Sequence, residues 1–358
     1  MTRDPRPDDT PPRPGGPGAG PGAGRAVRLR PLFAGLAVAV ALAVGYALVA
    51  PPSVSPVPAP AVPEAEAAPP GLLGGAAPFA VRAGDVVVPF DTLAVFVLPG
   101  DTLAVEALYT ASAEATAGGG ALRRTGPRSW AWAAPPGPGL TPIRVTGAGG
   151  ATVAVQAFTL APFSHAADRI GAYEIGDYQD EPLGGDPAYA EPAGFVEVTR
   201  DLRDAPVSPH FRLGDFLAKQ PSGWPKYLAL SPRLLVKLER LLAAVNAAGV
   251  PARGLTVMSG YRTPAYNAAI GNTTVYSRHL YGDAADVFVD EDGDGRMDDL
   301  DGDGAVTAAD AEWLAALADG VEAGPHGAGL VGGVGVYGPA PHRGPFVHVD
   351  TRGTAVRW

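Results

Sequence analysis

The sequence of 358 residues contains no cysteine. This absence excludes disulfide bonds, a cysteine-ligated zinc site, a thiol nucleophile and a lipoprotein anchor, so an exported form would depend on packing or on metals for its stability. The sequence also lacks a basic stretch interleaved with aromatic residues. Nucleic acid is therefore not expected as a partner.

Positive charge is scarce in one region in particular. The formal net charge is −10, and the segment from Asp290 to Glu312 alone holds ten carboxylates against the single Arg296, which leaves −9. The acidity is therefore local, and the rest of the chain is close to neutral.

The N-terminal part contains most of the excess of glycine and proline. Residues 1–30 lack the apolar content needed to fold and are expected to form a disordered cytoplasmic tail. The uncharged apolar run at 31–50 follows three arginines and predicts a transmembrane signal anchor, so the remainder would lie outside the cytoplasm, in the periplasm or the extracellular space. A cleaved signal peptide and a secreted protein are the alternative. Residues 51–75 form a linker rich in proline and alanine.

Short apolar runs with period-two alternation fill residues 76–163 and are separated by turns rich in glycine and proline. They predict an all-β, immunoglobulin-like antiparallel sandwich. Trp130 and Trp132 could face outward as a ligand platform or inward as core. After an irregular connector at 164–191, residues 192–358 mix strands with amphipathic helices and predict an α+β domain, in which a small antiparallel sheet is flanked by helices.

The stretch that carries the chemistry is residues 277–290, "SRHLYGDAADVFVD". His279 and Asp286 can bind zinc from a loop and from the strand that begins near Asp286, and the small residues between them allow the backbone to fold close to the metal. The third ligand has to come from another segment, and His348 in "PFVHVDTRG" is the best candidate. Asp350 lies on the same face of that strand, because side chains alternate along a strand.

A family resemblance follows from these residues. Ser277, His279, Gly282, Ala284 and Asp286 fill every position of a Ser-x-His-x-x-Gly-x-Ala-x-Asp motif. The motif is similar to that of the zinc D-Ala-D-Ala carboxypeptidase family, which includes VanX-like dipeptidases and murein endopeptidases. The blocks "MSGYRTPAYN", "GGVGVYG" and "FVHVD" resemble its flanking segments, and the likeness extends over residues 195–358.

The resemblance implies a role for each matching residue. His279, Asp286 and His348 would be the zinc ligands, and a water with a pKa lowered by the metal would attack a peptide carbonyl. Arg262 would bind the substrate carboxylate or the developing oxyanion. A structural ion pair is the alternative for Arg262. Ser277 would form a hydrogen bond near the site and contribute to substrate binding, or it would cap its loop.

One position departs from the family pattern. Many members carry an acidic general base three residues before the last ligand, where this sequence has Pro345. Asp350 is the proposed substitute, either as the catalytic base or as the group that orients a ligand. In a different registration of the motif, His348 would be the acid/base and Asp350 the ligand. His342 is a weaker candidate and is expected to be a loop residue.

The resulting hypothesis is a membrane-anchored zinc peptidase that hydrolyses peptidoglycan stem or cross-link peptides, as a D,D-carboxypeptidase or a murein endopeptidase. Its partners would be peptidoglycan peptides and, through the N-terminal helix, the membrane. The alternative is a non-catalytic protein that binds or scaffolds the cell wall and retains the peptidase fold.

The pattern of the acidic segment at 290–310 predicts a calcium-binding insert. Two overlapping frames, counted from Asp290 and from Asp299, place glycine at position 6 of a loop that resembles an EF-hand. Their overlap indicates a compact insert with shared ligands, anchored by Met297 and Val306 and followed by a helix. The expected ligands are Asp290, Asp292, Asp294, Asp298, Asp299, Asp301, Asp303 and Asp310.

Overall fold

The computed structural model describes residues 76–164 and 167–358. The predicted transmembrane helix at 31–50 lies outside these residues, as do the predicted tail and linker. Within the described ranges, no helix has the length and the apolar character needed to span a bilayer.

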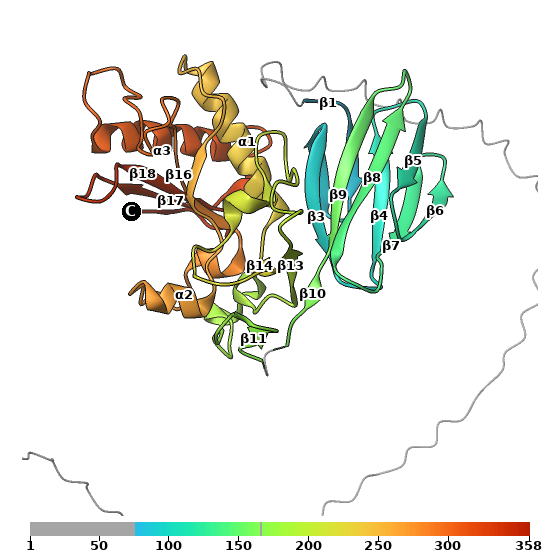
Figure 1. The fold of residues 1–358 in the computed structure, drawn as a ribbon. Helices are drawn as coiled ribbons and strands as arrows, with labels where there is room; N and C mark the ends of the chain where they lie inside the picture. Colours follow the sequence, from blue (N-terminus) through green and yellow to red (C-terminus); the bar gives the residue numbers. More distant parts are fainter. Residues whose placement is uncertain (1–75, 165–166) are drawn as a thin grey trace, which may run out of the picture. The chain divides into compact units, whose positions relative to one another are not determined.

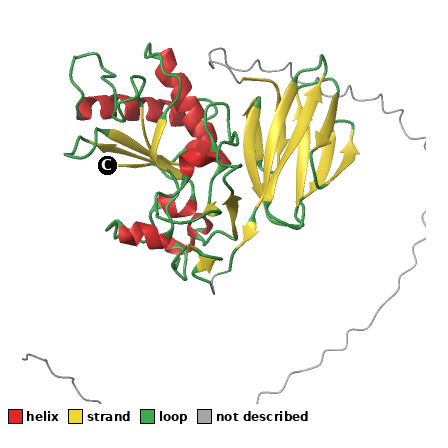
Figure 2. Cartoon of the chain, in the orientation of Figure 1, coloured by secondary structure: helices red, strands yellow, loops and turns green. Residues whose placement is uncertain are grey.

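The first part of the described chain contains two β-sheets that pack face to face, with β1 against β9 (Figures 1 and 2). One sheet has the strand order β2-β1-β4-β7-β6 and the other has the order β3-β9-β8-β5. The pairings are antiparallel except for β3 with β9, which run parallel. The strands are β1 (Ala76–Ala83), β2 (Val86–Phe90), β3 (Thr92–Val97), β4 (Thr102–Leu108), β5 (Ala113–Ala117), β6 (Ala121–Gly126), β7 (Ser129–Ala133), β8 (Gly139–Gly147) and β9 (Thr152–Thr159).

The two tryptophans of β7 settle one alternative left open by the sequence. Trp130 is 4% exposed and Trp132 is fully buried, and the Trp132 Nε1–H donates to the carbonyl of Gly119 at 2.9 Å. The idea of an outward-facing ligand platform is therefore wrong. Large aromatic rings fill the space between two sheets, and the strand alternation points both of them inward.

The second part is built around a mixed sheet with the order β15-β16-β18-β17-β19. All neighbouring pairs are antiparallel except β17 with β19. The strands are β15 (Thr256–Ser259), β16 (Ala284–Phe288), β17 (Gly333–Tyr337), β18 (Phe346–Asp350) and β19 (Val356–Arg357). Shorter strands flank this sheet: β10 (Ala161–Pro162), β11 (Arg169–Ile170), β12 (Tyr173–Glu174), β13 (Gly194–Val198) and β14 (Lys226–Leu228).

Three α-helices accompany these strands: α1 (Pro232–Ala247), α2 (Pro264–Ala269) and α3 (Ala308–Ala323). Each begins at a capping hydroxyl: Ser231, Thr263 and Thr307 accept backbone N–H groups of the first turn. The position of α1 agrees with the amphipathic pattern of its sequence, and α3 lies where a helix was expected after the acidic segment. Short 3-10 helices occur at Leu183–Gly185, Pro187–Tyr189, Leu213–Phe216, Arg278–Tyr281 and Ala328–Leu330.

The central sheet has one apolar and one polar face. Val347 and Val349 of β18 are fully buried on the face that packs against α3, which in turn contacts α1. The register places Ser259, Asp286, His348 and Gly335 in one row across the strands on the other face. The alternation of side chains along a strand therefore directs the chemistry-bearing residues away from the helices.

Within the predicted connector, the described residues 167–191 form two short strands and two 3-10 helices, and they take part in the core. Ile175 and Tyr178 are buried, and the Tyr178 hydroxyl donates to the carbonyl of Leu280 at 2.7 Å. Burial raises the pKa of Tyr178 well above its ordinary value, so the phenol keeps the proton that it donates. The connector thus supports the short helix that carries His279.

Candidate metal centre

Three side chains from distant parts of the sequence meet on the polar face of the sheet. His279 comes from the 3-10 helix at Arg278–Tyr281, Asp286 from β16 and His348 from β18. His279 Nε2 lies 3.2 Å from Asp286 Oδ1 and 3.2 Å from His348 Nδ1, and His348 Nδ1 lies 3.0 Å from Asp286 Oδ1. All three residues are buried. We refer to them as the His-Asp-His group.

The hydrogen bonds behind the two rings define which nitrogen of each is available. His279 Nδ1 lies 2.6 Å from the carbonyl of Gly260, and His348 Nε2 lies 3.1 Å from Asp350 Oδ2. Both of these oxygens can only accept, so the ring nitrogens that face them carry the protons. In the neutral imidazoles, the lone pairs of His279 Nε2 and His348 Nδ1 therefore converge with Asp286 Oδ1 on one point.

This arrangement fits a metal ion. Ligand atoms about 2.0–2.1 Å from a tetrahedral zinc lie about 3.3 Å from one another, close to the three distances of the group. The pKa of His279 is lowered, mainly by burial. Burial also opposes the charged form of His348, but hydrogen bonds to Asp286 and Asp350 outweigh it and raise the pKa of His348. For Asp286, the penalty of burial is outweighed by His279 and His348, which lower the pKa of its carboxyl.

The motif residues between the ligand candidates shape the backbone. Gly282 has a φ of 73°, and a Cβ at this position would lie 2.3 Å from the backbone of Ala229, so a side chain cannot be accommodated. Asp283 does not join the group, and instead forms a buried ion pair with Arg278, with 2.9 Å between Arg278 Nε and Asp283 Oδ1. Ser277 begins the short helix, where its carbonyl accepts from Leu280 N–H and its side chain forms no capping hydrogen bond.

Asp350 lies behind His348. Its carboxylate is fully buried and accepts from Arg352 Nε at 2.9 Å and from Gly333 N–H at 2.8 Å, in addition to its contact with His348 Nε2. The carboxylate is thus on the opposite side of the imidazole from Asp286. This geometry suits a group that orients a ligand. The registration that the structure presents has His348 in the triad of donor atoms and Asp350 outside it.

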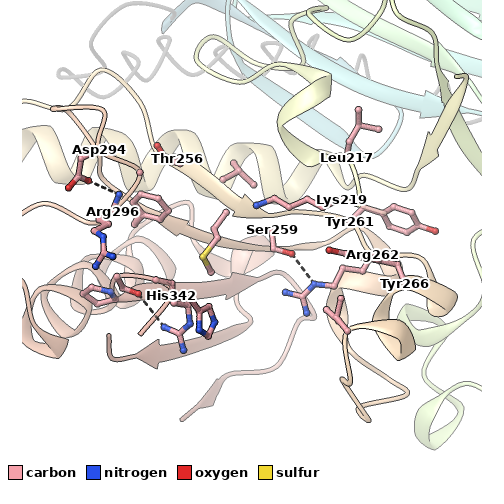
Figure 3. Close-up of a pocket in the computed structure, with 18 residues that line it drawn as sticks. Leu217, Lys219, Thr256, Ser259, Tyr261, Arg262, Tyr266, Asp294, Arg296 and His342 are labelled. Carbon is pink, nitrogen blue, oxygen red and sulfur yellow. Dashed lines mark hydrogen bonds between the residues drawn. The ribbon is translucent and has the colours of Figure 1, made fainter. Parts of the chain in front are cut away.

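Arg262 contacts the His-Asp-His group through the second carboxylate oxygen of Asp286. Its Nη2 lies 2.6 Å from Asp286 Oδ2, and its Nε donates to Ser259 Oγ at 2.8 Å. The ion pair expected as the alternative is therefore present. Arg262 also lines a pocket of about 760 Å³ (Figure 3), which a substrate-binding role would require.

The same pocket contains two positions that the sequence had singled out. Pro345, which occupies the place of the family's acidic base, lines the pocket together with His342. Of the described residues that line it, only Asp294 carries a carboxylate. Asp294 is therefore the one carboxylate among these lining residues, and its Oδ1 accepts from the backbone N–H of Arg296 at 2.8 Å.

Trp358 is a site residue that the sequence did not reveal. Its ring centroid lies 5.2 Å from that of His348, and its Nε1–H donates to Tyr337 Oη at 2.8 Å. A Cβ at Gly335 would lie 2.4 Å from the indole, so the glycine leaves the space that the ring occupies. Alternating glycines in "GGVGVYG" were the available signal, because a glycine within a strand often marks the close approach of another group.

The acidic insert forms two similar loops in succession. Asp290, Asp292 and Asp294 place carboxylate oxygens within 4.8 Å of one another, and so do Asp299, Asp301 and Asp303. Asp290 accepts from the N–H groups of Gly293 and Gly295, and Asp299 accepts from those of Gly302 and Gly304. Asp290 and Asp299 occupy equivalent places in the two loops, so the repeat is nine residues long.

The ends of the two loops differ from the expected frames. Asp298 Oδ2 accepts from Glu291 N–H in the first loop, whereas Asp310 Oδ1 accepts from Leu300 N–H in the second. Asp301 belongs to the second group of carboxylates, so the structure does not place it as a ligand shared by both. Met297 is buried as expected, but Val306 is 43% exposed and anchors nothing. Leu300, 5% exposed, supplies the second anchor.

A comparison with models of protein families gives a match over part of the chain. The family model described as Peptidase M15 matches residues 218–300, which include Arg262, His279, Asp286 and residues 290–300 of the acidic insert. No curated protein and no solved structure matches the chain. M15 peptidases are zinc-dependent, and the buried His-Asp-His group can hold a metal. At this coarse level, residues 218–300 resemble a zinc metallopeptidase of the M15 family.

Proposed function

We propose that the protein is a zinc-dependent peptidase that hydrolyses stem or cross-link peptides of peptidoglycan, as a D,D-carboxypeptidase or a murein endopeptidase. The observation that carries the proposal is the convergence of two imidazole lone pairs and one carboxylate oxygen within 3.0–3.2 Å. Bound zinc supplies Lewis-acid activation of water and of the scissile carbonyl.

The chain's own residues have separable roles in this proposal. His279, Asp286 and His348 hold the metal, and Gly260 and Asp350 fix the ring orientations through the far nitrogens. Arg262 keeps Asp286 in place and presents its remaining N–H groups to a carboxylate or an oxyanion of the substrate. Ser277 begins the helix that carries His279, which is compatible with a contribution to substrate binding at that edge.

Incubation of the full-length, zinc-loaded chain with purified cross-linked muropeptides tests the proposal. We expect new amino and carboxyl termini from the wild type and none from His279→Ala, because loss of one of three protein ligands disables a catalytic zinc site. Arg123→Gln, a change at an exposed position of β6, is the matched control. Stoichiometric zinc in His279→Ala by elemental analysis would contradict the ligand assignment.

A non-catalytic function in binding or scaffolding the cell wall is the second candidate. Pro345 in place of the acidic base favours it, together with the burial of the Asp350 carboxylate against Arg352. Sedimentation with insoluble peptidoglycan separates the two functions. Zinc-dependent binding without any product after prolonged incubation would favour the scaffold.

We further propose that the insert at 290–310 binds calcium and that the chain is anchored in the membrane by residues 31–50, with its folded part outside the cytoplasm. Two clusters of three carboxylates support the calcium sites. A hydrogen bond from Asp303 N–H lowers the pKa of Asp301, but desolvation and neighbouring carboxylates outweigh it and raise that pKa. A divalent cation would relieve this repulsion.

A further inference from the structure

The pocket beside the His-Asp-His group carries an excess of positive charge. Lys219, Arg262, Arg296 and Arg343 line it, against the single carboxylate of Asp294. The whole chain has a net charge of −10, so the sign of this pocket opposes that of the molecule. Clustered charge of one sign in a concave site raises the local concentration of ligands of the opposite sign.

Two of the four cations are already engaged by the protein. Arg262 pairs with Asp286 at 2.6 Å. Arg343 Nη1 donates to the carbonyls of Gly338 at 2.7 Å and Gly344 at 3.2 Å, and its guanidinium lies 4.6 Å from the centre of the Phe346 ring. These contacts hold the side chains of Arg262 and Arg343 in place in the lining of the pocket.

The other two cations are available to a ligand. The side chains of Lys219 and Arg296 are exposed, and neither forms an ion pair within the part of the chain that the structure describes. Asp294 Oδ1 accepts from the backbone N–H of Arg296 at 2.8 Å, which leaves the guanidinium out of that contact. Figure 3 shows Lys219, Arg262 and Arg296 around the same hollow.

The volume and the apolar lining of the pocket are also those of a binding site. Its volume of about 760 Å³ lies within the range of about 300–1,000 Å³ that is typical of ligand pockets. Val257, Met258 and Phe288 also line the pocket and provide apolar surface. A ligand with an aliphatic stem and an anionic end matches this combination.

We propose that the pocket is a subsite for a carboxylate-bearing side chain of the peptide substrate, with Lys219 and Arg296 as the groups that bind the carboxylate. The inference rests on the proposed function and adds a substrate class. Peptides with a free side-chain carboxylate near the scissile bond are preferred over peptides in which that carboxylate is amidated. A guanidinium binds a carboxylate through two parallel N–H groups and loses this geometry with an amide.

The test uses two muropeptides that differ only in one side-chain group, a free carboxylate or its primary amide. We expect the zinc-loaded, full-length wild type to cleave the acid form with a kcat/KM about tenfold higher, mainly through KM. Lys219→Gln and Arg296→Gln each reduce this preference, and the double variant abolishes it. Arg123→Gln retains it.

Binding measurements keep this proposal separate from the catalytic one. If the wild type cleaves neither peptide, the proposed function fails, and calorimetric titration of both peptides into the same zinc-loaded proteins still tests the subsite. Tighter binding of the acid form by the wild type, lost in the double variant, supports it. Equal affinity of the wild type for both forms, or a preference that survives in the double variant, would overturn it.

Discussion

At the scale of single residues, the site depends on which ring nitrogen each histidine presents. His348 contacts Asp350 through Nε2 and Asp286 through Nδ1, so the two aspartates lie at opposite edges of one ring. A carboxylate behind a metal-binding imidazole fixes its tautomer and raises its basicity. The function of Asp350 is therefore open to a direct substitution test.

We expect Asp350→Asn to keep stoichiometric zinc but with an affinity lower by about tenfold or more, since loss of such a partner typically costs about 10–100-fold. His348→Ala should lose the metal. Competition with a chelator measures both. Complete loss of zinc in Asp350→Asn would favour the registration in which Asp350 is the ligand. Turnover that falls far more than zinc occupancy would instead favour the predicted general base.

The raised pKa of His348 gives zinc binding a defined pH dependence. Without metal, the charged form of His348 contributes stability that is fully present below its unfolded pKa and is lost as pH rises through the raised folded pKa. Zinc requires the neutral ring, so its affinity falls as pH decreases through that same raised value. In Asp350→Asn this loss should move to lower pH. Zinc titrations of the wild type and of Asp350→Asn across a pH series measure this shift. The same pH dependence of zinc affinity in both proteins would contradict the inference.

Trp358 provides a further test at a single position. Its indole packs on His348, with the two rings tilted by 45°, and over Gly335, and aromatic pairs are typically worth about 0.5–1.5 kcal/mol. We expect Trp358→Ala to lower zinc affinity, because the His348 ring loses a packing partner, and Trp358→Phe to restore part of it. Gly335→Ala should reproduce the effect by displacing the indole. Wild-type affinity in Gly335→Ala would argue against this packing role.

At the scale of secondary-structure elements, a buried ion pair joins α1, α3 and β18. Lys237 Nζ lies 2.5 Å from Glu322 Oε1 and 2.6 Å from the carbonyl of Asp350, and the lysine side chain is fully buried. Burial lowers the pKa of Lys237, and Glu322 opposes this effect. The strand that carries His348 is thus tied to both helices.

Lys237→Ala should destabilise the fold by about 3 kcal/mol, because it leaves Glu322 and the carbonyl of Asp350 without their buried donor. This is the lower end of the usual range for breaking a buried pair, since Arg357 Nη2 also contacts Glu322 at 2.6 Å. Urea unfolding measures the change. The double variant Lys237→Met, Glu322→Leu should recover much of it, and a double variant as unstable as the single one would show that the charges are not the cause.

At the scale of the whole molecule, the acidic insert connects two elements of the peptidase-like region. It begins at Asp290, two residues after the end of β16, which carries Asp286, and it extends to Asp310 in the first turn of α3. Ordering of the insert would therefore stabilise both the strand and the helix.

We expect millimolar calcium to raise the thermal unfolding midpoint of the zinc-loaded, full-length chain by several degrees, and excess magnesium to do much less. Asp299→Asn should reduce the gain, because its carboxylate belongs to the second cluster. Asp201→Asn, at an exposed position outside the insert, should not. A midpoint that is the same with and without calcium would leave the aspartates as surface charge.

The sequence alone determined the features that depend on local chemistry. Apolar periodicity predicted the helix α1, and a helix was expected after the acidic segment, where α3 lies. Ligand chemistry and the resemblance to a family motif singled out the three side chains that the fold brings within 3.0–3.2 Å. Periodicity and motif spacing are local patterns, so they can be recognised without coordinates.

Other features were decided only by the tertiary structure. The orientation of Trp130 and Trp132, the exposure of Val306 and the position of Asp350 behind His348 each depend on which surface packs against the residue. The same holds for Trp358 over Gly335 and for Lys219 and Arg296 in one pocket, since these residues are far apart in the sequence. Contacts across such separations arise from strand register and loop closure, which the local pattern does not encode.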